Sequence, residues 1–121
     1  MSVHKVRLQA TFIWRIKDGS VKANDTNVAV AVYAISRDGR GNERTTNITT
    51  SCEVAQQVVD ATSGLHVIEA IHDFDSTVMK PVQYIIVCRD NTADQHVFLS
   101  AKVLPGNWKK DEIYVYPVVQ Q

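Results

Sequence analysis

The stretch VRLQATFIWRI, from Val6 to Ile16, decides the fold class of this chain. On an extended backbone, one side of this stretch carries apolar side chains only. These are Val6, Leu8, Ala10, Phe12, Trp14 and Ile16. A helix repeats every 3.6 residues and does not keep a period of two over eleven residues. The stretch therefore predicts a β-strand with one buried face, and it places Trp14 in the core.

The rest of the chain repeats this pattern of short strands separated by turn residues such as Asp-Gly and Pro-Gly. The further expected strands cover residues 27–36, 44–51, 65–74, 82–89, 95–104 and 112–119. Residues 53–61 are ambiguous, because their valines fit a short helix as well as a strand. Without crossover helices, this order predicts an all-β fold. We expect an antiparallel, immunoglobulin-like β-sandwich of seven or eight strands, with at most one short helix near 53–61.

The composition of three of these expected strands indicates where each lies in a sheet. Residues 44–51 are rich in threonine and poor in apolar side chains, which suits an edge strand. Pro117 cannot donate a hydrogen bond to a neighbour, so the last strand is expected at an edge or at its own end. Residues 27–36 are apolar on both sides, which predicts a central strand or one covered by a partner.

Length and composition indicate a single globular domain over residues 1–121. The chain is 45% hydrophobic and 21% charged, a composition unlike that of disordered segments. Thirteen basic residues balance thirteen acidic ones. The sequence thus lacks the positive charge typical of nucleic-acid binders, and it offers no polybasic patch for a membrane surface. We expect neither nucleic acid nor a membrane as a partner.

The N-terminus and the cysteines predict a protein made in the cytoplasm. No apolar segment of the length of a secretory signal follows the first charges, and the longest apolar run is too short to span a bilayer. Immunoglobulin domains place a tryptophan between their paired cysteines, whereas Trp14 and Trp108 lie outside the interval from Cys52 to Cys88. Two reduced, buried thiols are therefore expected.

One short string resembles a catalytic motif. Residues 73–77, DFDST, match the D-x-D-x-T motif of haloacid-dehalogenase-like phosphatases. That resemblance would imply Asp73 as nucleophile and Asp75 as general acid/base beside Mg²⁺. The family also needs a Rossmann-like domain and a downstream acidic pair, and neither fits the 44 residues after Thr77. A turn capped by its own side chains is the more economical interpretation.

The same carboxylates suggest a second possibility, a calcium site. Residues 45–79 contain five acidic residues and no lysine or arginine, and clustered carboxylates in β-sandwich loops often bind Ca²⁺. The candidate ligands are Asp73, Asp75 and Glu69. The alternative is a solvated acidic face that balances residues 1–44, where eight basic residues face four acidic ones.

The sequence gives only weak signals for other kinds of functional site. His66 and His72 share one face of a strand but lie about 20 Å apart along it, too far to ligate one ion, so surface or half-buried histidines are expected. No nucleophile elbow, phosphate-binding glycine loop or zinc spacing is present in the sequence. We expect no enzymatic activity and no cofactor. Trp108, beside a Pro-Gly-Asn turn, either closes the end of the sandwich or anchors a partner or a sugar ring.

Two strands that are apolar on both sides predict self-association. A single small domain cannot cover both faces of residues 28–35 and 113–119, and the usual cover is another copy of the same subunit. We therefore expect a homo-oligomer, or a subunit docked in a larger assembly. The residues expected at the interface are Val30, Val32, Tyr33, Tyr114, Tyr116 and Trp108.

Residues 12–39, FIWRIKDGSVKANDTNVAVAVYAISRDG, resemble the opening of small immunoglobulin-like β-sandwich domains of tailed-phage tail, baseplate and head-decoration proteins. In those domains a strand ends in a Lys/Arg-Asp-Gly turn, followed by a polar loop and a valine-rich strand. Downstream, His66 stands where such domains often have an aromatic residue. The resemblance implies a non-catalytic assembly role in a virion. The alternative is a β-sandwich binding module for Ca²⁺, carbohydrate or a protein.

Overall fold

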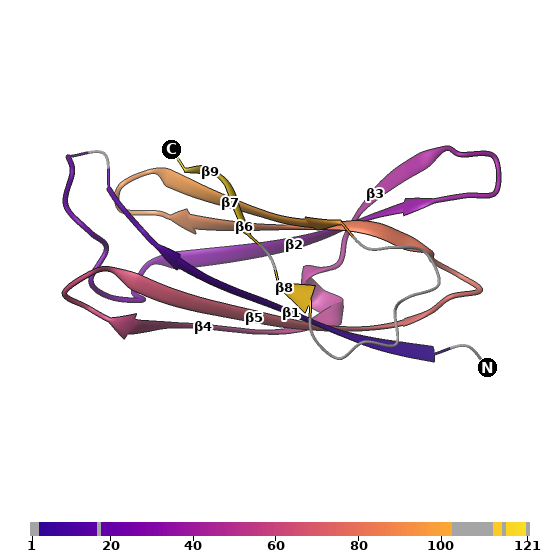
Figure 1. The fold of residues 1–121 in the computed structure, drawn as a ribbon, viewed down its shortest axis with the longest axis horizontal. Helices are drawn as coiled ribbons and strands as arrows, with labels where there is room; N and C mark the ends of the chain where they lie inside the picture. Colours follow the sequence, from indigo (N-terminus) through magenta and orange to yellow (C-terminus); the bar gives the residue numbers. More distant parts are fainter. Residues whose placement is uncertain (1–2, 17, 103–112, 115, 121) are drawn as a thin grey trace.

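The computed structural model describes residues 3–16, 18–102, 113–114 and 116–120, and beyond residue 100 it describes the backbone alone. The described part of the chain forms two stacked β-sheets, confirming the β-sandwich (Figure 1). The first sheet has the order β4 (Cys52–Asp60), β5 (Leu65–Asp75), β1 (Val3–Ile13), β8 (Ile113–Tyr114). The second has the order β3 (Glu43–Asn47), β2 (Val28–Arg37), β6 (Pro81–Asp90), β7 (Gln95–Lys102), β9 (Tyr116–Gln120).

Strand pairing is antiparallel except between β1 and β8, which run parallel. Residues 53–61 do not form the short helix considered for them, because almost the whole segment lies in β4, paired with β5. Pairing with a neighbouring strand thus outweighs the helical spacing of the valines. A single-turn 3-10 helix, η1 (Thr49–Ser51), joins β3 to β4 and crosses from one sheet to the other.

The C-terminal strand expected over 112–119 differs from the observed structure. It is divided into β8, which pairs with β1, and β9, which pairs with β7 in the opposite sheet. Alternation of side chains marks an extended segment, but it does not show where the chain passes from one sheet to the other. The described part therefore contains the seven strands β1 to β7 and, from the C-terminal segment, the two short strands β8 and β9.

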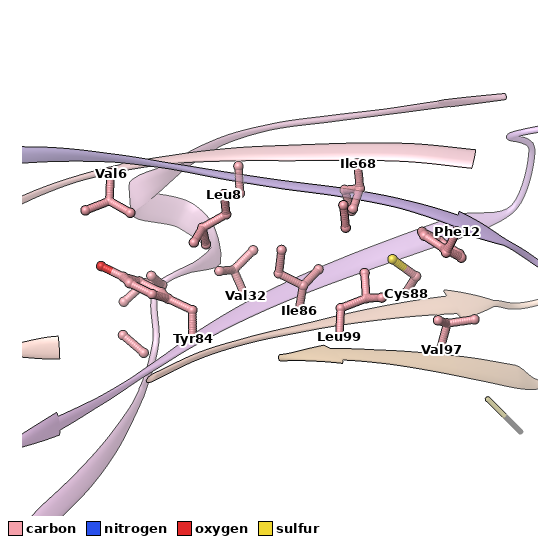
Figure 2. Close-up of a cluster of buried hydrophobic side chains, with 14 of the residues drawn as sticks. Val6, Leu8, Phe12, Val32, Ile68, Tyr84, Ile86, Cys88, Val97 and Leu99 are labelled. Atoms are coloured by element: carbon pink, nitrogen blue, oxygen red, sulfur yellow. The ribbon is translucent and has the colours of Figure 1, made fainter. Parts of the chain in front are cut away.

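The core lies between the sheets, where β1 contributes the predicted side chains. Val6, Leu8, Ala10 and Phe12 are buried, and Trp14, just past the end of β1, is fully buried. They face side chains from β6 and β7 such as Ile86, Cys88 and Leu99 (Figure 2). Each buried large side chain contributes about 1.5–3 kcal/mol by leaving water, so this layer of contacts holds the two sheets together.

The structure confirms the predicted place of three strands in their sheet. β2 is central, because β3 pairs with one side of it and β6 with the other. β3, the threonine-rich strand, is an edge strand, and β9, which contains Pro117, is the opposite edge of the same sheet. The loop from Asp38 to Asn42 is an exposed hairpin connection in which Asp38 Oδ1 accepts hydrogen bonds from the amides of Arg40 and Asn42.

Candidate functional site

The outer faces of the two sheets differ in character. On the four-stranded sheet, the outward positions of β1 and β5 are mixed, because charged side chains such as Lys5, Arg7 and Asp73 lie beside Ile13, Val67 and Ile71. On the five-stranded sheet, the central outward positions are apolar and partly exposed. We call this set the apolar face, and it consists of Ala31, Tyr33, Ile35, Ile85, Val87 and Phe98.

Strand register joins the apolar face into continuous rows. Val87 pairs with Ala31 on β2 and with Phe98 on β7, which places three apolar side chains side by side across the sheet. In the next row, Ile85 pairs with Tyr33. Cross-strand neighbours on one face have Cβ atoms about 4.5–5.5 Å apart, so these side chains form one patch. The ring of His96 stacks on Phe98 at the margin of the patch, with ring centroids 5.9 Å apart.

The residues predicted for an interface are divided between the two faces of the sheet. Tyr33 belongs to the apolar face. The prediction is wrong for Val32, because its side chain is fully buried in the core and cannot contact a partner. Val30 shares that inward face and packs against the core. The side chains of Tyr114 and Tyr116 lie outside the described residues, as does Trp108. Alternation separates the two faces of β2, but it does not tell which of two apolar faces points inward.

The three predicted calcium ligands are not brought together. Glu69, Asp73 and Asp75 all project from the outer face of β5, at separate positions along the strand. The carboxylate of Glu69 lies 3.8 Å from Arg7 Nε. Asp75 is already engaged in a turn (below). Within residues 3–16 and 18–100, no three histidine, cysteine or carboxylate side chains form a group that could hold a metal ion.

The DFDST string forms a capped turn, as expected. Asp75 Oδ1 accepts hydrogen bonds from the Thr77 amide at 2.8 Å and from the Thr77 hydroxyl at 2.7 Å. These bonds lower the pKa of Asp75, the hydroxyl bond most. Asp73 lies on the exposed outer face, whereas Phe74 between them is buried. The two carboxylates of the motif thus lie along a strand end and not in a helix-flanked catalytic pocket.

A buried polar network at one end of the sandwich was not expected from the sequence. Lys22 Nζ lies 3.2 Å from Asp90 Oδ2, and both side chains are almost fully buried. Lys22 Nζ also donates to the Thr26 carbonyl and lies 5.7 Å from the centre of the Trp14 ring. Burial raises the pKa of Asp90, but hydrogen bonds from Lys22 and from the amides of Thr92 and Ala93 outweigh it, so the pKa stays below its ordinary value.

His66 extends this network into the core. Its Nε2 donates to the Lys22 carbonyl at 2.8 Å, and its Nδ1 accepts from the Gln56 amide at 2.8 Å. Both ring nitrogens are therefore occupied in the neutral imidazole. Burial is the main cause that lowers the pKa of His66, and the positive charge of Lys22 adds to it.

His72 is the second buried histidine, so the expectation of surface or half-buried histidines is wrong for both. Its Nδ1 hydrogen-bonds the hydroxyl of Tyr84 at 2.8 Å across the core. Burial lowers the pKa of His72 and raises that of Tyr84, so both stay neutral near pH 7. The sequence did carry a signal for this burial. His66, Ile68, Ala70 and His72 follow one another at intervals of two residues, so they share the side of β5 that faces the core.

The cysteines are unpaired, as predicted. Cys88 is fully buried between the sheets, whereas Cys52 on β4 is only partly buried. Burial raises the pKa of Cys88 to about 12 and that of Cys52 to about 11. A thiol is nucleophilic only as a thiolate, so neither cysteine is suited to nucleophilic catalysis at neutral pH.

Three open surface depressions lie in the described part. One of them, of about 400 Å³, lies between the β2–β3 hairpin and the turn after β5. Its charged residues include Arg37 and Glu43, which pair with each other at 2.6 Å. The depression therefore lacks the enclosed apolar walls typical of small-molecule sites. Among the described residues, no helix is long and apolar enough to cross a membrane.

Comparison with known proteins adds no further constraint. No protein-family model, no curated protein and no solved structure matches the chain. Function is therefore inferred from the surfaces and buried groups described above.

Proposed function

We propose that this protein is a non-catalytic structural subunit that assembles with copies of itself through the apolar face. The observation that carries the proposal is the apolar face itself, whose side chains lie next to one another across three strands of the five-stranded sheet. Contiguous apolar patches on soluble proteins mark contact surfaces, because leaving them in water costs free energy in proportion to their area.

A second copy fits this face better than a small ligand. The patch lies on a sheet without an enclosed cavity, and sheets of two subunits pack face to face at about 10 Å when their side chains interdigitate. The projecting rings of Tyr33 and Phe98 lie one residue row apart, beside the smaller Ala31 and Val87. Large and small side chains in alternate positions allow a copy related by a two-fold axis to interlock with it.

The setting we propose is the virion of a tailed phage. The support is the resemblance of residues 12–39 to the β-sandwich domains of tail, baseplate and head-decoration proteins. Such subunits act through their contacts and need no catalytic group, which agrees with raised cysteine pKa values and dispersed carboxylates. The proposal therefore assigns the apolar face to contacts in an assembly.

The test is the molar mass of wild-type protein and of Val87→Lys, measured by light scattering over a range of concentrations. Val87 lies between Ala31 and Phe98, so a lysine there places a charge in the middle of the contact. We expect wild-type protein to form an oligomer and Val87→Lys to weaken it at least tenfold.

Thr11→Lys is the matched control, because Thr11 is exposed on the outer face of β1, in the opposite sheet. It introduces the same charge into a strand of the same sandwich and should leave the oligomer intact. A wild-type chain that stays monomeric at high concentration would contradict the proposal, as would an equal response to both substitutions.

A further inference from the structure

Among the described residues the sandwich has four sheet edges, and three of them carry features that prevent a further strand from adding. β8 is only two residues long, β3 is five residues long and begins with Glu43-Arg44, and β9 contains Pro117. Short length, charge and proline are the usual means by which proteins protect exposed edges.

β4 has fewer of these features, because its two carboxylates, Glu53 and Asp60, lie near its ends and its register shift lies between Val58 and Asp60. It is nine residues long, contains no proline, lysine or arginine, and is uncharged from Val54 to Val59. Within the described residues β5 is its only neighbour in the sheet, so the other side of the strand presents its backbone N–H and C=O groups. A long, uncharged edge of this kind is a template for pairing with another strand.

The inward side of β4 is also incompletely covered. Val54 points to the same side as the fully buried Ala70 opposite it on β5, yet 36% of Val54 is exposed. Figure 1 shows the reason, since β3 and β4 extend from η1 toward opposite ends of the sandwich, and β3 therefore does not lie over β4. Val58, on the same side, is only partly buried. The edge thus exposes both backbone groups and apolar side chains.

We infer that β4 is a second contact surface, at which it pairs antiparallel with β4 of a second copy and joins two four-stranded sheets into one continuous sheet. The sequence of β4 is close to self-complementary about Gln56. In that register Val54 lies opposite Val58 of the second copy, and the two Gln56 residues face each other. The regular part of β4 ends at Val58, because its register with β5 shifts between Val58 and Asp60, and within that part no carboxylate of one copy lies opposite a carboxylate of the other.

This inference deepens the proposed self-association and rests on it. The apolar face joins copies through sheet faces, whereas β4 joins them side by side, so the two contacts lie on different parts of the subunit. Two different two-fold contacts on one subunit link copies into an extended array and not into a closed dimer. The edge contact therefore gives the proposed structural subunit a means to propagate.

The charge of the segment around β4 predicts how this contact depends on salt concentration. Each copy carries five acidic and no basic residues between Thr45 and Met79, the segment that contains β4. Two such segments repel each other as they approach, and dissolved salt screens the repulsion. Association through β4 should therefore become tighter as the salt concentration rises.

The test compares Val54→Lys with Ala55→Lys by light scattering and sedimentation. An inward-pointing lysine at an edge can reach solvent in the free subunit but is trapped once a second strand covers it. Ala55 is exposed on the outer face of the same strand, where a lysine does not obstruct pairing. We expect Val54→Lys to lower the molar mass to half of the wild-type value or less, and Ala55→Lys to leave it unchanged.

Two further measurements keep the inference separate from the proposed function. A loss of mass in Val87→Lys but not in Val54→Lys would overturn the edge contact and retain the apolar face. The converse would retain the edge and overturn the face. Should Val54→Lys fail to fold, hydrogen exchange of the wild-type protein decides. The free-edge amides of β4 must become protected as protein concentration or salt rises, and unchanged exchange would overturn the inference.

Discussion

At the scale of single residues, the ion pair of Lys22 and Asp90 ties the loop after β1 to the end of β6. The pair is buried, and its members also hydrogen-bond backbone groups of the loops on either side. An ion pair in such a site repays the cost of leaving water only when both partners are present. The fold at this end of the sandwich therefore depends on each of the two charges.

Lys22→Met should lower the free energy of unfolding by about 3–5 kcal/mol, because Asp90 would remain buried without its cation. The double variant Lys22→Met/Asp90→Asn should recover part of the lost free energy of unfolding, since an uncharged amide replaces the carboxylate that has lost its cation. Arg89→Met is the control, because Arg89 and Asp94 form an exposed pair and should contribute less than about 1 kcal/mol. Urea unfolding measures all three. Similar losses for Lys22→Met and Arg89→Met would contradict a structural role for the buried pair.

These residues also show what sequence reasoning could not find. Lys22 and Asp90 are far apart in the chain, and lysine and aspartate are almost always exposed, so nothing in the sequence suggests that they meet. The carboxylates at 69, 73 and 75 were conspicuous as a string, yet they are distributed along one strand. Spacing in sequence indicates which side chains share a face, whereas contacts between loops depend on how the sheets stack.

At the scale of elements, the turn between β4 and β5 depends on Gly64. Its φ of +74° lies in the left-handed region that favours glycine, and a Cβ there would lie 2.5 Å from Val21 Cβ. The Gly64 carbonyl also accepts a hydrogen bond from the Trp14 amide at 3.0 Å. The turn is thus packed directly against the segment that follows β1.

Gly64→Ala should destabilise the protein by about 2–5 kcal/mol, the sum of left-handed backbone strain and overpacking against Val21. Gly41→Ala is a matched control, because Gly41 also has a positive φ, +84°, but has open space where the Cβ would lie. It should cost only the strain, about 1–2 kcal/mol. Thermal melts of both variants give the comparison, and a loss for Gly41→Ala as large as that for Gly64→Ala would show that packing at Gly64 is unimportant.

Most strands could be predicted because alternation and turn residues are local signals. The strand at β1 and the central position of β2 followed directly from such patterns. β4 stayed ambiguous because Val54 and Val58 are spaced as on a helix and also share one side of a strand. Its pairing with β5, a tertiary interaction, decided the outcome. The division of the last strand into β8 and β9 likewise depends on partners that the sequence does not name.

At the scale of the whole molecule, the sequence predicted apolar surface on residues 28–35 and 113–119 but not which face of these strands points outward. Both faces of β2 are apolar, and only the stacking of the sheets shows that Val32 points inward and Tyr33 outward. The expected self-association therefore remains a prediction, and the described residues offer two surfaces on which to test it, the apolar face and the β4 edge.

The stability of the molecule should fall as pH drops below about 6.5, because of its two buried histidines. His66 and His72 have lowered pKa values in the folded protein, mainly through burial, and an ordinary value near 6.5 when unfolded. Below pH 6.5 the unfolded chain binds more protons than the folded one, which favours unfolding. Each histidine then costs up to about 1.4 kcal/mol per pH unit. The contribution of Asp90, whose folded pKa is also lowered, is lost only below about pH 4.

Urea unfolding at pH 7.5, 6.5, 5.5 and 5.0 tests this expectation. His72→Gln should flatten the decline, because glutamine does not titrate, while lowering stability at pH 7.5 through its imperfect fit beside Tyr84. His96→Gln, the same change on the outer face of β7, should keep the wild-type slope. A wild-type free energy of unfolding that is flat between pH 7.5 and 5.0 would mean that the histidines are protonated equally in both states. Such a result would contradict their burial as neutral groups in the core.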